Sequence, residues 1–406
     1  MLFSQVVGQQ QVKQHLLDMV QQNRLSHALL FLGTEGSGAL PLALAFAQYV
    51  SLLPASAKQP AVEISLFGEA ASSVPLEFPK TPDDADAFMQ KQPGFSKAEN
   101  YVHADIHYSY PVIPKKSGDK PVSTDYAAEW REFIQQYPYG NVYDWLQFID
   151  AENKQGNITA DECNDIIHKL SLKSFESPWK ILVMWMPEYL GKEGNKLLKV
   201  IEEPPPDTLF ILVAENEDAI LPTIVSRCQL VKISAIRSSA ISEALIQRGK
   251  TDPQKAQQIG AIAQGNYREA LQLLQDTSED WQSLLREWLN VTLKTGPTAQ
   301  VKWVEEVSRL GREKQKQFLL YFMHLLQQSI RLRFHEGEAF NIAETEKDFA
   351  VRLNKIASVN HQRAIIEELN NAVYFIERNA NAKILFHALT IKLYHVIKNN
   401  ALILTG

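Results

Sequence analysis

Ala28-Leu29-Leu30-Phe31-Leu32-Gly33-Thr34-Glu35-Gly36-Ser37-Gly38-Ala39-Leu40 is the stretch that decides the fold of this chain. It opens with an apolar run that is typical of a buried strand. Gly33 and Gly38 then have the spacing of the phosphate-binding motif G-x-x-x-x-G-K-[ST]. Apolar side chains recur at helical spacing after the loop, at Leu42, Ala45, Phe46 and Tyr49. A strand, a glycine loop and a helix in this order predict an α/β fold of the nucleotide-binding type.

The loop lacks the residues that carry the chemistry of this motif. Ala39 and Leu40 stand where the motif has lysine and serine or threonine. The lysine ammonium neutralises the β- and γ-phosphates and the hydroxyl holds magnesium, and neither side chain here replaces them. We therefore expect no cofactor at Gly33, Gly36, Gly38, Ala39 and Leu40. Taken alone, the segment is also compatible with an ordinary turn rich in glycine and serine.

Length and composition describe an ordinary folded protein. The 406 residues suffice for roughly two to four domains. Hydrophobic residues make up 45% and charged residues 22% of the chain, which argues against extended disorder. The net charge of -6 argues against tight nucleic-acid binding by the chain alone, although a local basic patch within an assembly is compatible with it.

The cysteines and the N-terminus favour a cytoplasmic protein. Cys163 and Cys228 are the only cysteines, too few for a disulfide framework or a four-cysteine zinc site. Residues 1–5 lack the basic and then apolar order of a signal peptide. The longest apolar stretch, residues 39–55, is too short and too interrupted for a membrane span, so we read it as the helix after the loop.

Proline usage divides the chain. Ten of the 19 prolines lie within residues 54–138, and only Pro297 lies beyond Pro253. Residues 54–150 therefore read as a long irregular insertion, with a possible strand over residues 108–112 and a possible helix over residues 125–136.

Alternating helices and strands follow the insertion. The pattern predicts helices over residues 160–170 and 195–203 and strands over residues 179–185 and 208–213. Such alternation predicts a parallel sheet with helices on both faces. From residue 238 onward the pattern is helical, and it includes an apolar helix over residues 318–326 and another over residues 379–398 with Asn381 as its N-cap.

Four motifs stand in series within residues 1–236, outside the proline-rich segment. They are Val7-Gly8-Gln9 with Arg24-Leu25-Ser26-His27-Ala28-Leu29-Leu30-Phe31, the defective loop, Asn195-Lys196-Leu197-Leu198-Lys199-Val200-Ile201-Glu202-Glu203-Pro204-Pro205, and Ser226-Arg227-Cys228. In order and spacing they resemble the clamp-loader branch of the AAA+ proteins. One feature of many relatives, a four-cysteine zinc module after the first helix, is missing, and the proline-rich segment stands in its place.

The resemblance implies an architecture and a set of partners. It implies an α/β AAA+ (P-loop type) domain over residues 1–236, a small helical lid over residues 237–278 and an all-α collar for oligomerisation over residues 279–406. It further implies a non-hydrolysing subunit that helps to load a sliding clamp on primer-template DNA. ATP and magnesium would be bound by the clamp-loader ATPase subunits, which assemble with this chain and a delta-type subunit.

A second defect supports the non-hydrolysing reading. The strand that ends in the Walker B acids in active relatives ends here in Trp185 and Met186. Without these carboxylates the site has no second-shell magnesium ligand and no base to orient the attacking water. Glu188, the nearest acid, follows a proline, and we expect no catalytic role for it.

Arg227 is the strongest candidate for remaining chemistry. The resemblance implies that this arginine reaches the γ-phosphate of a neighbouring subunit in trans, as an arginine finger, with Ser226 and Cys228 as supporting residues. A planar, permanently charged guanidinium suits that role. The alternative is an arginine that pairs with a carboxylate or caps a helix. We expect Ser226 to cap the following turn and Cys228 to be buried, not nucleophilic.

Weaker candidates remain. The run Gly265-Asn266-Tyr267-Arg268 resembles the family's lid sensor, and Asn216 stands in the other sensor region. Arg268 is equally well explained by pairing with a nearby acid. The triplet His103, Asp105 and His107 has metal-ligand side chains but lacks a fourth ligand, so we expect no metal there. Competing readings are an autonomous ATPase that uses Lys196 or Lys199, and a DNA-binding protein that uses Arg331 and Arg333.

Overall fold

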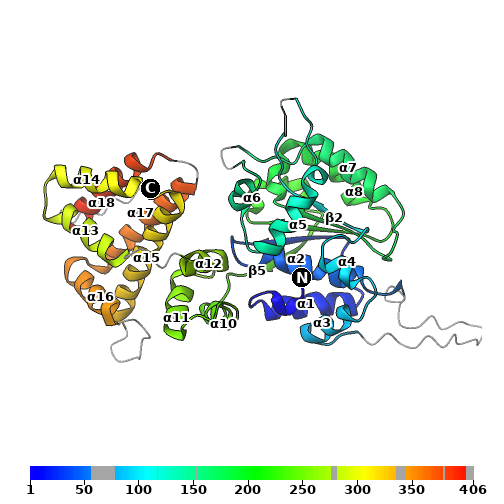
Figure 1. The fold of residues 1–406 in the computed structure, drawn as a ribbon, viewed down its shortest axis with the longest axis horizontal. Coiled ribbons are helices and arrows are strands. Elements are labelled where there is room, and N and C mark those ends of the chain that lie inside the picture. The colour runs from blue at the N-terminus through cyan, green and yellow to red at the C-terminus, as the bar shows by residue number, and fades with distance from the viewer. Residues whose placement is uncertain are drawn as a thin grey trace, which may run out of the picture. The chain divides into compact units, whose positions relative to one another are not determined.

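The computed structural model describes residues 1–55, 78–116, 118–151, 154–275, 281–334, 344–377 and 380–398. The chain divides into two compact units (Figure 1). Unit 1 comprises Met1–Ala244 and Gln264–Glu269, and unit 2 comprises Leu245–Ala263 and Ala270–Gly406. Residues of the predicted lid, 237–278, are therefore shared between the two units, and the lid and collar boundaries stay predictions.

A five-stranded parallel sheet forms the centre of unit 1. Its strands are β1 (Ala28–Gly33), β2 (Ile106–Ser109), β3 (Lys180–Trp185), β4 (Thr208–Ala214) and β5 (Gln229–Ile233). The strand order is β2-β3-β4-β1-β5, with Leu30 of β1 paired to Leu212 of β4 and Leu230 of β5. The predicted parallel sheet is thus confirmed, and β1 carries the glycine loop at its carboxyl end.

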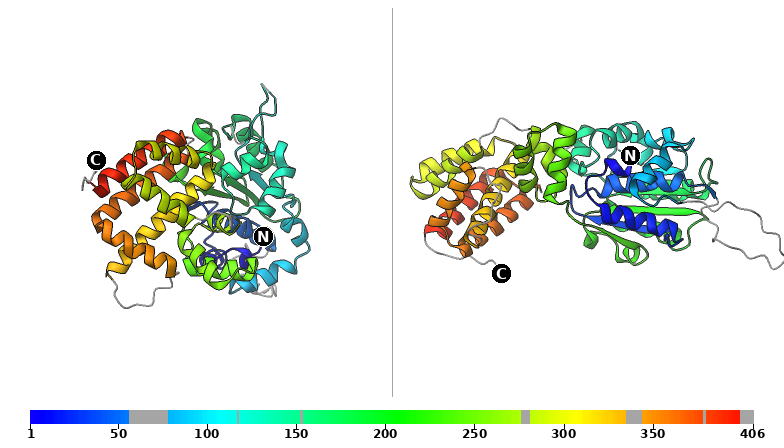
Figure 2. Two further views of the ribbon diagram at one scale, coloured as in Figure 1. Left: turned by 60° about the vertical axis from the view of Figure 1, so that its left-hand side comes forward. Right: turned by 90° about the horizontal axis from the view of Figure 1, so that it is seen from below.

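Helices cover both faces of this sheet (Figure 2). Successive side chains of β3 point to opposite faces of the sheet. Val183 packs in the apolar cluster that includes α2 and α5. Its neighbour Leu182 packs in the cluster on the other face, which includes α7 and α8. The helices of unit 1 are η1 (Phe3–Gln5), α1 (Gln10–Gln21), α2 (Ala39–Ser51), α3 (Pro82–Gln90), α4 (Phe95–Glu99), η3 (Ser123–Tyr126), α5 (Ala127–Gln136), α6 (Val142–Phe148), α7 (Ala160–Ser171), η4 (Pro187–Leu197), α8 (Leu198–Glu202), η5 (Glu217–Ala219) and α9 (Pro222–Val225). Two helices cross the unit boundaries, α10 (Ser238–Gly249) and α12 (Tyr267–Gln275).

The segment over residues 54–150 is more closely integrated than an insertion would be. Its strand, β2, begins two residues before the predicted start at Tyr108 and pairs with β3 as the edge of the sheet. In α5, Trp130 is buried and stacks on Tyr110 with ring centroids 4.0 Å apart. Because one strand and part of the core come from this segment, its described part belongs to the α/β fold. Residues 56–77 lie outside the described residues.

Unit 2 is helical in its described part, as predicted. Its helices are α11 (Pro253–Ile262), α13 (Trp281–Leu293), α14 (Pro297–Ser308), α15 (Arg312–Phe334), α16 (Glu344–Ile356), α17 (Val359–Glu377) and α18 (Ala382–Lys398). Trp288 and Trp303 stack in its core with ring centroids 5.0 Å apart. Asn381 Oδ1 accepts a hydrogen bond from the Ile384 N–H, which confirms the predicted N-cap. Among the described helices, none combines the length and apolar character that a membrane crossing requires.

Unit 2 contains a histidine that should make it sensitive to acid. His324 is buried in α15, and burial, with a smaller effect from Arg331, lowers the pKa of its imidazole to about 4. The unfolded chain binds this proton near its ordinary pKa of about 6.5. Between these values the unfolded state therefore holds more protons, and stability falls as pH falls.

We expect His324 to contribute up to about 3 kcal/mol of stability near pH 7, lost as the pH falls from about 6.5 to about 4. Chemical unfolding of the wild type and of His324→Gln at a series of pH values tests this. The variant should show a shallower loss of stability over that range, and parallel curves for the two proteins would contradict the assignment.

Candidate functional site

The glycine loop lies where the carboxyl ends of three neighbouring strands meet. It follows β1 and leads into α2, and the ends of β3 and β4 lie beside it in the sheet order. The cavity at this point is lined by Gly36, Gly38, Tyr139 and Met186 among others and measures about 20 Å³. A cavity of this size holds about one water molecule. It has no room for a nucleotide in this conformation.

A carboxylate of the loop itself ties the loop to two other segments. Asn141, at the start of α6, donates to Glu35 Oε2 at 2.8 Å. Asn266 donates to Glu35 Oε1 at 3.0 Å, and Arg268 Nη1 lies 3.3 Å from the same oxygen. The Tyr267 N–H donates to the Gly36 carbonyl at 3.0 Å. The loop is therefore held by side chains of its own protein.

Arg268 makes the strongest contact of this network. Its Nε and Nη2 donate to the two carboxylate oxygens of Asp144 at 2.5 and 2.6 Å, a bidentate pair. Only 4% of the Arg268 side chain is exposed. We call the set formed by Glu35, Asn141, Asp144, Asn266 and Arg268 the loop bridge. Arg268 is thus paired with acids, as one of the two sequence-based readings expected.

Glycine and tyrosine complete the closure around the loop. Gly36 has φ +67°, and a Cβ added there would lie 1.8 Å from Asn266 Oδ1, so this approach requires glycine. Tyr139 accepts a hydrogen bond from the Val7 N–H at 2.7 Å through its hydroxyl. Its ring meets Tyr267 edge to face at 4.8 Å between centroids. Tyr139 also lines the loop cavity, so its side chain occupies space beside the loop.

The end of β3 is built as apolar core. Trp185 is buried, and its ring lies 5.3 Å from Trp130. Glu188 Oε1 accepts hydrogen bonds from the backbone N–H groups of Glu215 and Asn216 at 2.6 and 2.9 Å, and burial raises the pKa of its carboxyl. Glu188 therefore links the segments that follow β3 and β4. Asn216 Oδ1 accepts from the Asp218 N–H and caps η5.

Arg227 occupies a more open position. Its side chain is 32% exposed, Nη1 donates to the Thr223 carbonyl at 2.8 Å, and Nη2 lies 3.2 Å from Glu202 Oε2. Ser226 does not cap the following turn as expected, because its hydroxyl donates back to the Thr223 carbonyl and the residue ends α9. Cys228 is only partly buried, not fully buried as expected, yet this burial raises the pKa of its thiol to about 11, so it is a poor nucleophile at neutral pH.

The alternative candidates fall outside the loop site. Lys196 pairs with Glu193 at 3.7 Å, and neither Lys196 nor Lys199 lines the loop cavity. In unit 2, Arg333 donates to the Ala357 carbonyl at 2.7 Å and so links α15 to the end of α16. These positions give no support to an autonomous ATPase or to a basic DNA-binding cluster.

Asp105 has a structural function. Its carboxylate accepts from the backbone N–H groups of Phe175, Glu176 and Ser177 at 2.6 to 2.7 Å, and His103 Nδ1 accepts from the Asp105 N–H. Within the described ranges, no group of three or more His, Cys, Asp and Glu side chains has the arrangement of a metal site.

Sequence reasoning missed most of the loop bridge. Glu35 occupies one of the unspecified positions of the motif, so nothing in the sequence marks it. Asn141 and Asp144 form a capping box at the start of α6, a pattern that predicts a helix start but not a partner for Arg268. That partner is 124 residues away in the chain.

Comparisons with known proteins point to one family. Residues 96–237 match the family described as "DNA polymerase III, delta subunit". The delta' subunit of Bacillus subtilis DNA polymerase III is 30% identical over 106 residues, 26% of this chain and 32% of that protein. The tau subunit of Bacillus subtilis is 25% identical over 278 residues, 67% of this chain and 37% of that protein. The chain thus spans about a third of the length of these relatives.

The solved structures that match this chain include a gamma subunit-related protein of DNA polymerase III from Thermotoga maritima. That structure has a TM-score of 0.36 and 13% identity over 93% of this chain and 98% of its own. The RuvB Holliday junction branch migration motor of Thermotoga maritima has a TM-score of 0.34 and 12% identity over 87% of this chain and 84% of its own. The strands and helices of the chain itself confirm the predicted α/β fold with a parallel sheet, followed by helical regions.

The loop bridge makes a strong prediction about stability. Asp144→Asn keeps the size of the side chain and its cap but removes the negative charge that faces the buried Arg268 guanidinium. Breaking a buried pair on one side costs about 3 to 5 kcal/mol. We expect a loss of this size in the free energy of unfolding of the α/β unit, measured by chemical denaturation.

The matched control is Asp83→Asn, which changes an exposed carboxylate of the same unit and should cost less than about 1 kcal/mol. Equal effects of the two substitutions would contradict the structural importance of the pair.

Proposed function

We propose, because the chain belongs to the DNA polymerase III clamp-loader family, that it is a non-hydrolysing subunit of the delta-prime type. It works in the cytoplasm, as part of a replicative DNA polymerase holoenzyme. It assembles there with ATP-hydrolysing relatives and a delta-type subunit, and the complex loads a sliding clamp onto primer-template DNA. The chain contributes a relatively rigid structural subunit and one arginine finger to this complex.

The loop bridge is the observation that carries this proposal. Nucleotide hydrolysis needs a cradle for phosphates, a cation at the β- and γ-phosphates, and carboxylates that hold magnesium and orient water. Here the Glu35 carboxylate is held beside the loop, where it would repel a phosphate. Ala39 and Leu40 supply neither charge nor hydroxyl, and buried Trp185 stands where an acid is needed. These features support a subunit without turnover of its own.

The surroundings of Arg227 support a role in trans. Three of its five N–H groups are engaged, two by Glu202 and one by Thr223, which leaves two for another ligand. The Glu202 carboxylate is itself 58% exposed. An exposed pair of this kind is worth about 0 to 1 kcal/mol, so a triphosphate with greater negative charge can displace it at little cost. The Thr223 contact meanwhile keeps the guanidinium anchored to α9.

The exchange of Glu202 for a phosphate as the partner of Arg227 gives this arginine a chemical role. The guanidinium, released from Glu202, donates hydrogen bonds to the γ-phosphate held by the neighbouring subunit. It stabilises the negative charge that develops on the phosphoryl oxygens during transfer to water. Because each copy of the chain carries one Arg227, each copy completes one neighbouring site.

The test is DNA-stimulated ATP hydrolysis by a complex reconstituted from this chain, the partner subunits of its genome, the clamp and primed DNA. Arg227→Ala should lower turnover at the adjoining site by about 10³-fold or more, by analogy with arginine fingers of GTPases, and the total by that site's share. Arg227→Lys should remain defective, because a lysine ammonium lacks the planar fork.

Two controls make the result interpretable. Arg237→Ala removes an exposed arginine of the same unit and should leave hydrolysis unchanged. Size-exclusion chromatography must show that each variant still assembles. ATP hydrolysis by the isolated chain would contradict the proposal that its own site is inactive. Full ATPase activity of the assembled Arg227→Ala complex would contradict the arginine finger and leave the chain a structural role only.

A further inference from the structure

A second cavity, of about 280 Å³, lies in unit 1 and shares no lining residue with the loop cavity. It opens along β2, the edge strand of the sheet, and is lined by residues from this strand, from the start of α5, and by Lys169 of α7. Because α5 and α7 pack on opposite faces of the sheet, the cavity lies at the sheet edge. Its volume corresponds to roughly nine water molecules, enough for a small organic ligand.

Aromatic side chains form one wall of this cavity. Tyr101 and Tyr108 meet edge to face with centroids 6.2 Å apart, and Tyr110 stacks on Trp130. Only 1% of Trp130 is exposed, and its indole N–H has no hydrogen-bond partner within the part of the chain that the structure describes. Trp130 therefore contributes apolar surface to this wall and not a donor that a ligand reaches.

The charged side chains that line the cavity are both cationic. The charge of Lys169 is already compensated, because its Nζ lies 2.5 Å from Asp165 Oδ2. The same Nζ donates a hydrogen bond to Thr124 Oγ1 at 2.6 Å. Arg131, in contrast, has no ion pair with any described residue. Burial lowers the pKa of His107 to about 4, with a contribution from Lys169, so this side chain is neutral at pH 7. Arg131 therefore gives the cavity an uncompensated positive charge.

The backbone of β2 adds one donor and one acceptor. The Ile181 N–H donates to the Asp105 carbonyl, so alternate residues of β2 face β3 and the backbone of Tyr108 faces the free edge. On that edge the Ile106 N–H donates to His103 and the Tyr110 N–H to Ser123. One residue with unpaired backbone groups is too short for strand addition by a peptide. It suits the adjacent donor and acceptor of a small planar ligand.

We propose that this cavity binds a nucleoside monophosphate. The base packs against the aromatic wall, its edge pairs with the backbone of Tyr108, and the phosphate takes the Arg131 guanidinium in a bidentate contact. The same chemistry is available from a free nucleotide and from the 5′-phosphorylated end of a DNA strand. The proposal is independent of the function inferred for Arg227 and the loop.

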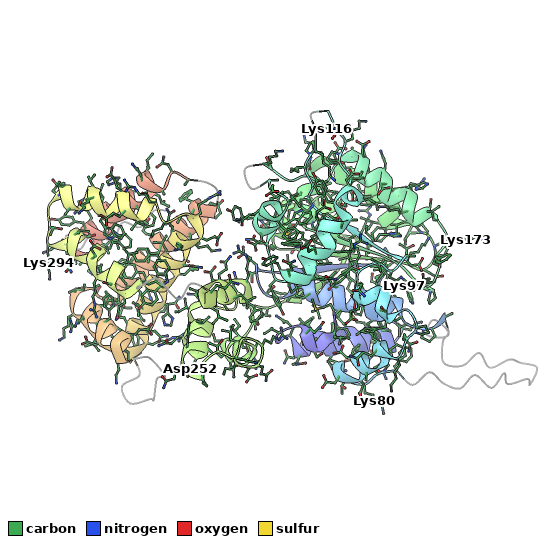
Figure 3. The ribbon with its side chains drawn as sticks, in the orientation of Figure 1. Lys80, Lys97, Lys116, Lys173, Asp252 and Lys294 are labelled. Carbon is green, nitrogen blue, oxygen red and sulfur yellow. The ribbon has the colours of Figure 1, made fainter. Side chains whose placement is uncertain are left out.

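The test is titration of the full chain with thymidine 5′-monophosphate, followed by isothermal calorimetry. We expect one site per chain. Arg131→Gln should weaken binding at least about tenfold, and thymidine, which lacks the phosphate, should lose a similar factor with the unmodified chain. Lys173→Gln, which removes an exposed charge of the same unit outside the cavity, should bind like the wild type (Figure 3).

Ala104→Phe gives a second test that leaves the charge unchanged. Ala104 lines the cavity and is exposed, so a larger side chain there fills the cavity at little cost in stability. Binding should be lost while the melting temperature is kept. No binding at millimolar nucleotide, or wild-type binding by Arg131→Gln or Ala104→Phe, would overturn the proposal.

A 5′-phosphorylated oligothymidylate distinguishes the two sources of the ligand. Tighter binding of this strand than of the mononucleotide, with the same loss in Arg131→Gln, assigns the site to a DNA end. Weaker or equal binding assigns it to the free nucleotide.

Discussion

The bidentate pair between Arg268 and Asp144 is the interaction on which the closed state of the loop depends. Both groups lie where water is largely excluded, and an unpaired charge in such a place costs several kcal/mol. The pair therefore fixes the segment that carries Arg268 against the start of α6. Glu35 extends the same network to the glycine loop through Asn141 and Arg268. Three segments that are far apart in the chain are thus held in one arrangement by contacts between their own side chains.

Arg268 and Arg227 differ in burial, and this difference suits the first to a structural role and the second to a chemical one. Arg268 is almost fully enclosed and matched by two carboxylates, so any other anion must displace a strong buried contact. Arg227 is partly exposed and faces one exposed carboxylate, which water and salt already weaken. The first arginine is suited to hold a conformation. The second is suited to exchange partners, as the role proposed for it requires.

The sequence predicts the sheet far better than it predicts the site. Residues 28–32 and 208–213 are apolar runs with few competing structures, and both are strands. The predicted strand starts two residues later than β2, because the start of β2 is set by its pairing with β3 at Ile106, a tertiary contact. The network around Glu35 follows from tertiary contacts across more than 100 residues, which no local pattern encodes. The same holds for the cavity beside β2, whose walls come from β2, η3, α5, α7 and the segment before β2.

The close approach of Gly36 to Asn266 has an evolutionary consequence. A phosphate loop that has merely lost its lysine and its hydroxyl can regain them through two substitutions. On the proposed function, a gain of nucleotide hydrolysis here would also require new residues at Glu35 and Tyr139, and acids in place of the aromatic packing around Trp185. Each single substitution of this kind disturbs a satisfied contact before it adds any activity. Nucleotide hydrolysis by this loop is therefore separated from the present sequence by a barrier that stepwise mutation crosses only through less stable intermediates.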